Sequence, residues 1–267
     1  MARVEGPVSG NVLLRKKQYR ISDDPAESAK IAKMFIIAKI SNARTVLARV
    51  IRDHPENCDA ERIKKVMDDM SLMIYKAEKN GNLEELRGIE GMASHLYFSA
   101  FNELIVAQKE GFCFTERSRR PPKDNINALL SFVYTLLVHE CRSALETVGL
   151  DPAVGFLHRD RPGRPSLALD LMEELRPYMG DRTALSLINR QQLTPECFTA
   201  SEGGGIYMSD SARKALLETW QKRKAEEITH PFLEEKIEVG LIPYTQALLL
   251  ARYMRGDIES YPPFLCK

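Results

Sequence analysis

The sequence is poor in cysteine and has no arrangement of cysteines typical of a zinc site. Its five cysteines are widely scattered, odd in number, and include no CxxC pair. Free thiols in a reducing compartment are the simplest interpretation. At 267 residues the chain is long enough to bury a core without disulfides or a structural metal, as one large domain or two small ones.

The sequence also lacks a secretory leader and any long uncharged apolar run. Residues 1–10 are polar and contain glycine, and no stretch approaches the length of a membrane-spanning helix. Hydrophobic residues make up 44% of the chain and charged residues 28%, which is typical of a folded globular protein. We therefore expect a soluble protein of the cytoplasm.

An excess of charge of one sign is absent as well. The net charge of +1 argues against a protein that coats nucleic acid through bulk positive charge. Local basic clusters are present, and each is more often a solvated surface than a ligand site. They are Arg15, Lys16, Lys17 and Arg20; Arg117, Arg119, Arg120 and Lys123; and Arg159, Arg161 and Arg164.

Helical spacing of apolar residues dominates the chain. The predicted helices cover about 24–52, 60–79, 83–101, 126–148, 166–176, 210–227 and 234–254. Proline and glycine predict loops over 111–124 and 149–165, so His158 should lie on a loop. Residues 3–15 favour the end of a strand, and 198–209 favour a small β-hairpin.

Two acids in the predicted helix 166–176 could carry chemistry. Asp170 and Glu173 are three residues apart, so their carboxylates share a face, while three leucines can take the buried side. Such a pair is usually only a soluble surface, and Glu174 beside it favours that interpretation.

His158 is a stronger candidate because it lies in an arginine-rich loop after the apolar segment 154–157. A neutral imidazole there could bind a metal while the arginines hold phosphate oxygens. The remaining histidines are interpreted as ordinary hydrogen-bonding residues. They are His54, His95, His139 and His230.

Glu90 is the third candidate. It lies between Gly88 and Gly91 in a helical segment, where each glycine costs about 1 kcal/mol relative to alanine. Close approach of another backbone or a substrate would explain this cost, and tight helix packing explains it nearly as well. A glutamate, a histidine and a second carboxylate would suit Mg²⁺ or Mn²⁺.

Four segments, 88–98, 121–134, 149–158 and 166–177, closely resemble the CRISPR-associated spacer-acquisition integrase family. They occur in the family's order, and the resemblance runs from Arg3 to Lys267. It implies that Glu90, His158 and Glu173 are metal ligands and that Asp170 is a supporting catalytic acid. Tyr134 matches a tyrosine near the family's active site.

The resemblance implies a metal-dependent DNA endonuclease and integrase that uses Mg²⁺ or Mn²⁺. Such an enzyme joins foreign DNA fragments into a CRISPR array by transesterification. The implied partners are DNA, a second copy of the chain and a small ferredoxin-like adaptation protein. The expected DNA-binding residues are Arg159, Arg161, Arg164, Arg117, Arg119, Arg120 and Lys123.

The predicted fold is mainly α, a multi-helix catalytic domain with a small β-hairpin. Family members usually begin with a β-rich domain that builds the dimer, so residues 1–22 are expected to be its strand and linker remnant and residues 23–267 the catalytic domain. Two rival functions stay open: a non-catalytic helical DNA-binding or scaffolding module, and a metal-dependent hydrolase of small phosphoesters.

Overall fold

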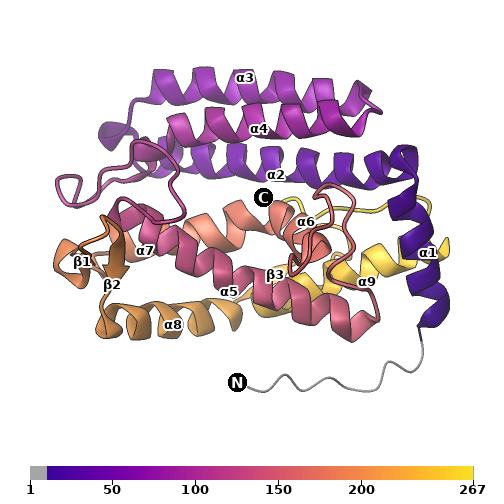
Figure 1. Cartoon of the computed structure of the whole chain (residues 1–267). Coiled ribbons are helices and arrows are strands. Elements are labelled where there is room, and N and C mark those ends of the chain that lie inside the picture. The colour runs from indigo at the N-terminus through magenta and orange to yellow at the C-terminus, as the bar shows by residue number, and fades with distance from the viewer. Residues whose placement is uncertain (1–10, 267) are drawn as a thin grey trace.

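The computed structural model, which describes residues 11–266, is built mainly of helices with two small antiparallel hairpins (Figure 1). The α-helices are α1 (Val12–Asp23), α2 (Pro25–Asp53), α3 (Ala60–Lys79), α4 (Leu83–Ser99), α5 (Asn125–Val148), α6 (Ser166–Leu175), α7 (Arg182–Asn189), α8 (Asp210–Lys224) and α9 (Ile242–Arg255). The strands are β1 (Phe198–Ala200), β2 (Ile206–Met208), β3 (Glu227–Thr229) and β4 (Lys236–Glu238). Short 3-10 helices cover Pro55–Asn57, Phe101–Leu104, Pro195–Cys197 and Val239–Leu241. The predicted mainly α fold is confirmed.

The first helix corrects the strand predicted over 3–15. Residues 1–10 lie outside the described part of the chain, but Val12–Asp23 is helical. Gln18 explains part of this choice, since its buried amide donates to the carbonyls of Asp151 and Val154 at 2.8 and 2.9 Å. These contacts lie more than 130 residues away in sequence, so local β propensity could not reveal them.

Helix α2 runs through the middle of the molecule. Asp24 caps it by accepting hydrogen bonds from the N–H groups of Ala26 and Glu27, with Pro25 in the first turn. It packs against α3 and α4 on one side and against α6 on the other, as the parallel layers in Figure 1 show. A helix covered on both sides positions its central residues inside the protein, and this places Lys39 there.

Helix α5 forms the second layer with α6 and α9. It ends at Gly149, whose φ of +87° is a left-handed conformation that glycine adopts without strain. The predicted helix and the loop that follows it are both confirmed. The loop 149–165 returns the chain to α6 and carries His158 past the first turns of α4, where Arg87 donates to the Leu157 carbonyl.

The helix after this loop begins at Ser166 as predicted, but Ser166 is its first residue and does not cap it. Its hydroxyl donates instead to the Arg159 carbonyl at 3.1 Å. Past Leu175 the chain continues as a π-helix over Arg176–Asp181 and then as α7, neither of which was predicted. Pro177 accounts for the change, because it lacks an N–H and its ring disturbs the preceding α-helical turn.

The hairpin predicted near 198–209 is confirmed, with Phe198 opposite Met208. The helix predicted over 234–254 is partly wrong, because β3 and β4 form a second hairpin and α9 begins only at Ile242. The buried His230 holds this turn: its Nδ1 accepts the N–H groups of Phe232 and Leu233. Within residues 11–266, no helix is long and apolar enough to cross a membrane.

Candidate functional site

The carboxylate of Asp170 fixes the loop that carries His158. It is completely buried and accepts three backbone N–H groups, those of Phe156 at 2.6 Å, Leu157 at 2.9 Å and His158 at 2.9 Å. The three N–H donors engage both oxygens of this carboxylate and so hold the loop against α6. The interpretation of Asp170 and Glu173 as a surface pair is wrong, because the loop covers this face of α6 and both acids are buried.

One glycine in the loop is required by this packing. A Cβ atom on Gly155 would lie 2.8 Å from Asp170 Oδ2 and 2.9 Å from the Ser166 carbonyl carbon. The glycines singled out beside Glu90 do not serve this purpose. Apart from the neighbouring backbone of α4, a Cβ atom on Gly88 or Gly91 would meet no described atom within 4 Å, so tight packing against another helix does not explain these two glycines.

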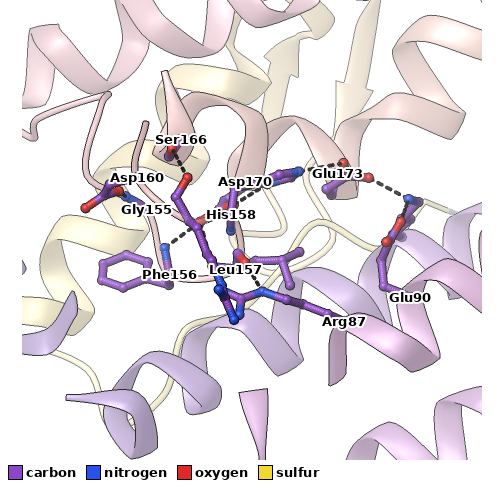
Figure 2. A network of polar contacts seen from close by, with 12 residues as sticks. Arg87, Glu90, Gly155, Phe156, Leu157, His158, Asp160, Ser166, Asp170 and Glu173 are labelled. Atoms are coloured by element: carbon purple, nitrogen blue, oxygen red, sulfur yellow. Dashed lines mark hydrogen bonds and ion pairs between the residues drawn. The ribbon is translucent and has the colours of Figure 1, made fainter. Parts of the chain in front are cut away.

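The imidazole of His158 is oriented by the same acid. Its Nδ1 lies 2.6 Å from Asp170 Oδ1, and its Nε2 lies 4.0 Å from Glu173 Oε1 (Figure 2). With Nδ1 donating to the carboxylate, the neutral ring keeps its lone pair on Nε2, the nitrogen that faces Glu173. This carboxylate–histidine arrangement is common behind metal-bound histidines.

Glu90 and Glu173 approach each other from α4 and α6, and Lys39 of α2 joins them. The Lys39 ammonium forms an ion pair with Glu90 Oε1 and lies 2.7 Å from Glu173 Oε2. Ser94 donates a further hydrogen bond to Glu90 at 2.9 Å, and Arg176 donates to Glu173 at 2.8 Å. Three separate helices therefore bring two acids to one buried cation.

The electrostatics keep Glu173 ionised. Burial alone would raise its pKa, but the positive charges of Arg176 and Lys39 outweigh burial and lower the pKa to about 2. Removing either cation would leave a buried carboxylate poorly compensated. The site thus holds negative charge that needs a positive partner.

The residues match a divalent ion in the chemistry of their donor atoms. Glu173 Oε2 is buried and makes no hydrogen bond of normal geometry, although it contacts Lys39. Two carboxylates and an imidazole nitrogen match the donors that Mg²⁺ and Mn²⁺ use. Across residues 11–266, no three His, Cys, Asp or Glu side chains already stand in ligand geometry, so here the ammonium of Lys39 is the cation between the acids.

Tyr134 lies beside this group but does not touch its acids. Its ring packs under the Arg176 guanidinium, 4.8 Å from the centroid, and its hydroxyl donates to Asp181. Tyr97 donates to the other oxygen of Asp181 at 2.9 Å. Tyr134 therefore supports Arg176, which in turn contacts Glu173.

The predicted DNA-binding residues fall into two environments. Arg159 is exposed and pairs with Glu84 at the start of α4, close to His158 in the chain. Arg117 is half-buried, and its guanidinium donates to Asn127 at 2.6 Å and Ser131 at 3.1 Å, which gives it a structural role. The others lie at the surface, with Arg164 half-buried: Arg119, Arg120, Lys123, Arg161 and Arg164.

Sequence reasoning missed Lys39 and Arg176. The available signal for Lys39 was its place in an apolar stripe: it follows Phe35 by four residues and precedes Val46 by seven, and both neighbours are buried. A lysine on such a face is rarely buried without a partner. The available signal for Arg176 was its spacing of three residues from Glu173, which places the two side chains on one face of a helix.

Comparison with known proteins identifies the family of this chain. Residues 1–222 match the family model described as CRISPR associated protein Cas1. The chain belongs to the Cas1 family. A CRISPR-associated endonuclease Cas1 of Chlorobaculum tepidum is 54% identical over 265 residues, which are 99% of this chain and 77% of that protein. Another from Rhodospirillum rubrum is 55% identical over 270 residues, covering 100% of this chain and 78% of that protein.

Solved structures show the same fold. A casposase bound to an integration product superposes with a TM-score of 0.81 at 25% identity, over 94% of this chain and 70% of that one. A Cas1 protein from Thermotoga maritima gives a TM-score of 0.78 at 25% identity, over 96% of this chain and 74% of that one. A partial Cas6-RT-Cas1–Cas2 complex contains a chain with a TM-score of 0.81 at 24% identity; it covers 100% of this chain and 76% of that one.

Proposed function

We propose that this chain is a divalent-metal-dependent DNA endonuclease and integrase that inserts DNA fragments into a CRISPR array. The observation that carries the proposal is the cation of Lys39 held between Glu90 and Glu173, with His158 Nε2 facing Glu173. Membership in a family of named endonucleases and the likeness to a casposase bound to an integration product support it.

The residues that would hold Mg²⁺ or Mn²⁺ are Glu90, Glu173 and His158. When bound, such an ion polarises a phosphoryl oxygen and stabilises a leaving alkoxide. Asp170 holds the His158 ring so that Nε2 stays available as a donor atom. Lys39, whose ammonium contacts both acids, is a second positive group close enough to hold the backbone phosphate of the substrate.

The non-catalytic alternative treats the acids as incidental. Incidental acids would face solvent, whereas Glu173 and Asp170 are buried at 3% and 0% exposure and held by charged or backbone donors. Burying a carboxylate costs free energy, and a non-catalytic scaffold gains no function from that cost. Buried acids that orient a histidine therefore favour the enzyme.

The experiment is cleavage and strand transfer of labelled duplex DNA with Mn²⁺. We expect His158→Ala and Glu90→Gln to lose activity by at least about 100-fold, because metal ligands act in the transition state. His95→Ala on α4 and Glu218→Gln on α8 are matched controls, since both residues are exposed. Full turnover in either ligand variant would refute the assignment. The small-substrate alternative is tested separately, by comparing how well unlabelled duplex DNA and a small phosphodiester compete with the labelled DNA.

The basic residues at the surface of the 149–165 loop are proposed to guide DNA to this site. Replacing Arg161 and Arg164 by glutamine should weaken binding to all DNA sequences similarly and flatten the salt dependence, because phosphate contacts release counterions without reading bases. Unchanged affinity and salt slope would show that the DNA follows another path.

The partners of the chain are proposals of the same kind. A second copy and a small ferredoxin-like adaptation protein follow from the resemblance, and the Cas6-RT-Cas1–Cas2 complex supports an assembly with a Cas2 protein. Light scattering of the chain alone, and after mixing with a Cas2 protein, measures both. A monomer that binds no such protein would contradict this part.

A further inference from the structure

A second group of basic residues surrounds a cavity away from the acids. The cavity has a volume of about 380 Å³ and lies among the end of α2, α7 and the last turn of α8. Four of its lining residues are arginines: Arg49, Arg182, Arg190 and Arg223. Asp53 is the one carboxylate among the lining residues, which leaves an excess of three positive charges, four minus one.

Half of this positive charge is not neutralised by the described residues. Arg49 pairs with Asp53 at 3.1 Å, but the guanidinium groups of Arg182 and Arg190 form no hydrogen bond or ion pair with any residue between 11 and 266. Arg223 lies 3.7 Å from a carboxylate oxygen of the exposed Glu226 and donates to the Tyr178 carbonyl, yet its buried Nε makes no hydrogen bond. Gathering like charges around a hollow costs free energy that a bound anion would recover.

The arginines of the cavity lie close enough to affect one another's pKa values. Burial lowers the pKa of Arg223, and the neighbouring charges of Arg49 and Arg190 lower it further, against the opposing effect of Tyr178 and Glu226. Burial and the charge of Arg223 likewise lower the pKa of Arg182. The arginines therefore act on one another through the cavity, and an anion placed there would contact several of them.

We infer that this cavity binds backbone phosphates of the DNA strand whose reacting phosphate lies at the Glu90–Glu173 site. The inference rests on the proposed function. Guanidinium groups hold phosphate oxygens through paired N–H donors, and a concave site lined by several of them suits a phosphate better than a flat surface does. The chemistry selects a phosphodiester, with an acidic protein segment as the alternative that the test must exclude.

Two elements connect the cavity to the acids. Lys39 and Arg49 both lie on α2, and ten residues of helix span about 15 Å. Arg176, which contacts Glu173, and Arg182 lie on the continuous segment formed by the π-helix and α7. At roughly 3.4 Å per nucleotide in each strand, the two sites are about four nucleotides apart.

The test is the binding of a fluorescent single-stranded thymidine 12-mer by anisotropy, in EDTA, at several salt concentrations. The variant is Arg182→Gln/Arg190→Gln. Losing two phosphate contacts should make the slope of log K against log salt shallower by about 1.4, which corresponds to roughly 25-fold weaker binding at about 0.1 M salt. Both side chains lack ion pairs, and Arg182 contacts only the ring of Tyr178, so we expect the variant to melt close to the wild-type temperature.

The matched control is Arg255→Gln, an arginine at the end of α9 that pairs with Asp257 outside the cavity. It should keep the wild-type slope. Equal slopes for wild type and the double variant would overturn the inference, and so would displacement of the 12-mer by polyglutamate as effectively as by unlabelled DNA. The binding test contains no metal and so does not depend on catalysis. If the double variant shows the shallower slope but the wild-type protein shows no Mn²⁺-dependent cleavage, the inference about the cavity stands and the proposed function is refuted.

Discussion

Replacing Lys39 by methionine tests the idea that its ammonium takes the place of a metal ion. Methionine keeps most of the side-chain length and removes the charge between Glu90 and Glu173. Breaking a buried ion pair by removing one partner costs about 3–5 kcal/mol. Arg176 still contacts Glu173, and the Glu90 side chain is 25% exposed, so we expect the lower end, about 3 kcal/mol.

This loss should appear in thermal unfolding and should be reversed by metal. For a chain of this size 1 kcal/mol corresponds to roughly 2–4 °C, so the variant in EDTA should melt about 6–12 °C below wild type. Mn²⁺ at 100 times its dissociation constant adds about 2.7 kcal/mol. The gain should be larger in the variant than in wild type, where the ion must first displace Lys39.

The assay is differential scanning fluorimetry in EDTA and across a Mn²⁺ titration, with Mn²⁺ affinity measured independently by electron paramagnetic resonance. Lys30→Met is the control, because Lys30 is an exposed residue of the same helix whose pair with Glu27 should contribute little. Equal melting temperatures for Lys39→Met and wild type in EDTA, or equal stabilisation of both proteins by Mn²⁺, would refute this role of Lys39.

Three further outcomes are expected. Burial, opposed by the hydrogen bonds from two tyrosines, raises the pKa of Asp181 from 3.8 to about 6. The contribution of protonated Asp181 to the free energy of unfolding is therefore complete below about pH 3.8 and is lost as the pH rises through 6. In the wild-type protein this loss lowers the free energy of unfolding by about 3 kcal/mol at most between those two pH values. Urea unfolding at each pH should show that the decrease is absent from Asp181→Asn. Asp170→Asn should weaken Mn²⁺ binding about 10–100-fold in a calorimetric titration, because the His158 ring loses its orienting acid; unchanged affinity would show that Asp170 has no such role. Gly155→Ala should cost about 1–3 kcal/mol in urea unfolding because its Cβ would overlap Asp170, and an alanine variant as stable as wild type would contradict the described loop.

The sequence predicted the helical fold well because the signals are local. The start of α2 at Asp24, the end of α5 at Gly149 and the hairpin near 198–209 each depend on a few neighbouring residues, and all three are confirmed. The elements that were missed depend on distant contacts. Helix α1 is held in place by Gln18, which reaches carbonyls of the 149–165 loop.

The candidate site divides in the same way. Residue type and family resemblance singled out Glu90, His158 and Glu173, and the structure brings His158 Nε2 to Glu173 and both acids to Lys39. What the sequence could not show is burial: Asp170 looked like a surface acid because the loop that covers it has no periodic pattern. Helical spacing describes one face of a helix but not what covers it.

The π-helical turn at Arg176–Asp181 has a consequence for how this protein tolerates changes in length. Each α-helical residue turns the chain by about 100°, so deleting one residue from the turn would rotate everything after it relative to everything before. Glu173 would keep its place, while Arg182 and its neighbours in α7 would face another direction. The number of residues in this turn is therefore as constrained as their identity, and single-residue insertions or deletions should be far less tolerated here than at the exposed residues 202–204.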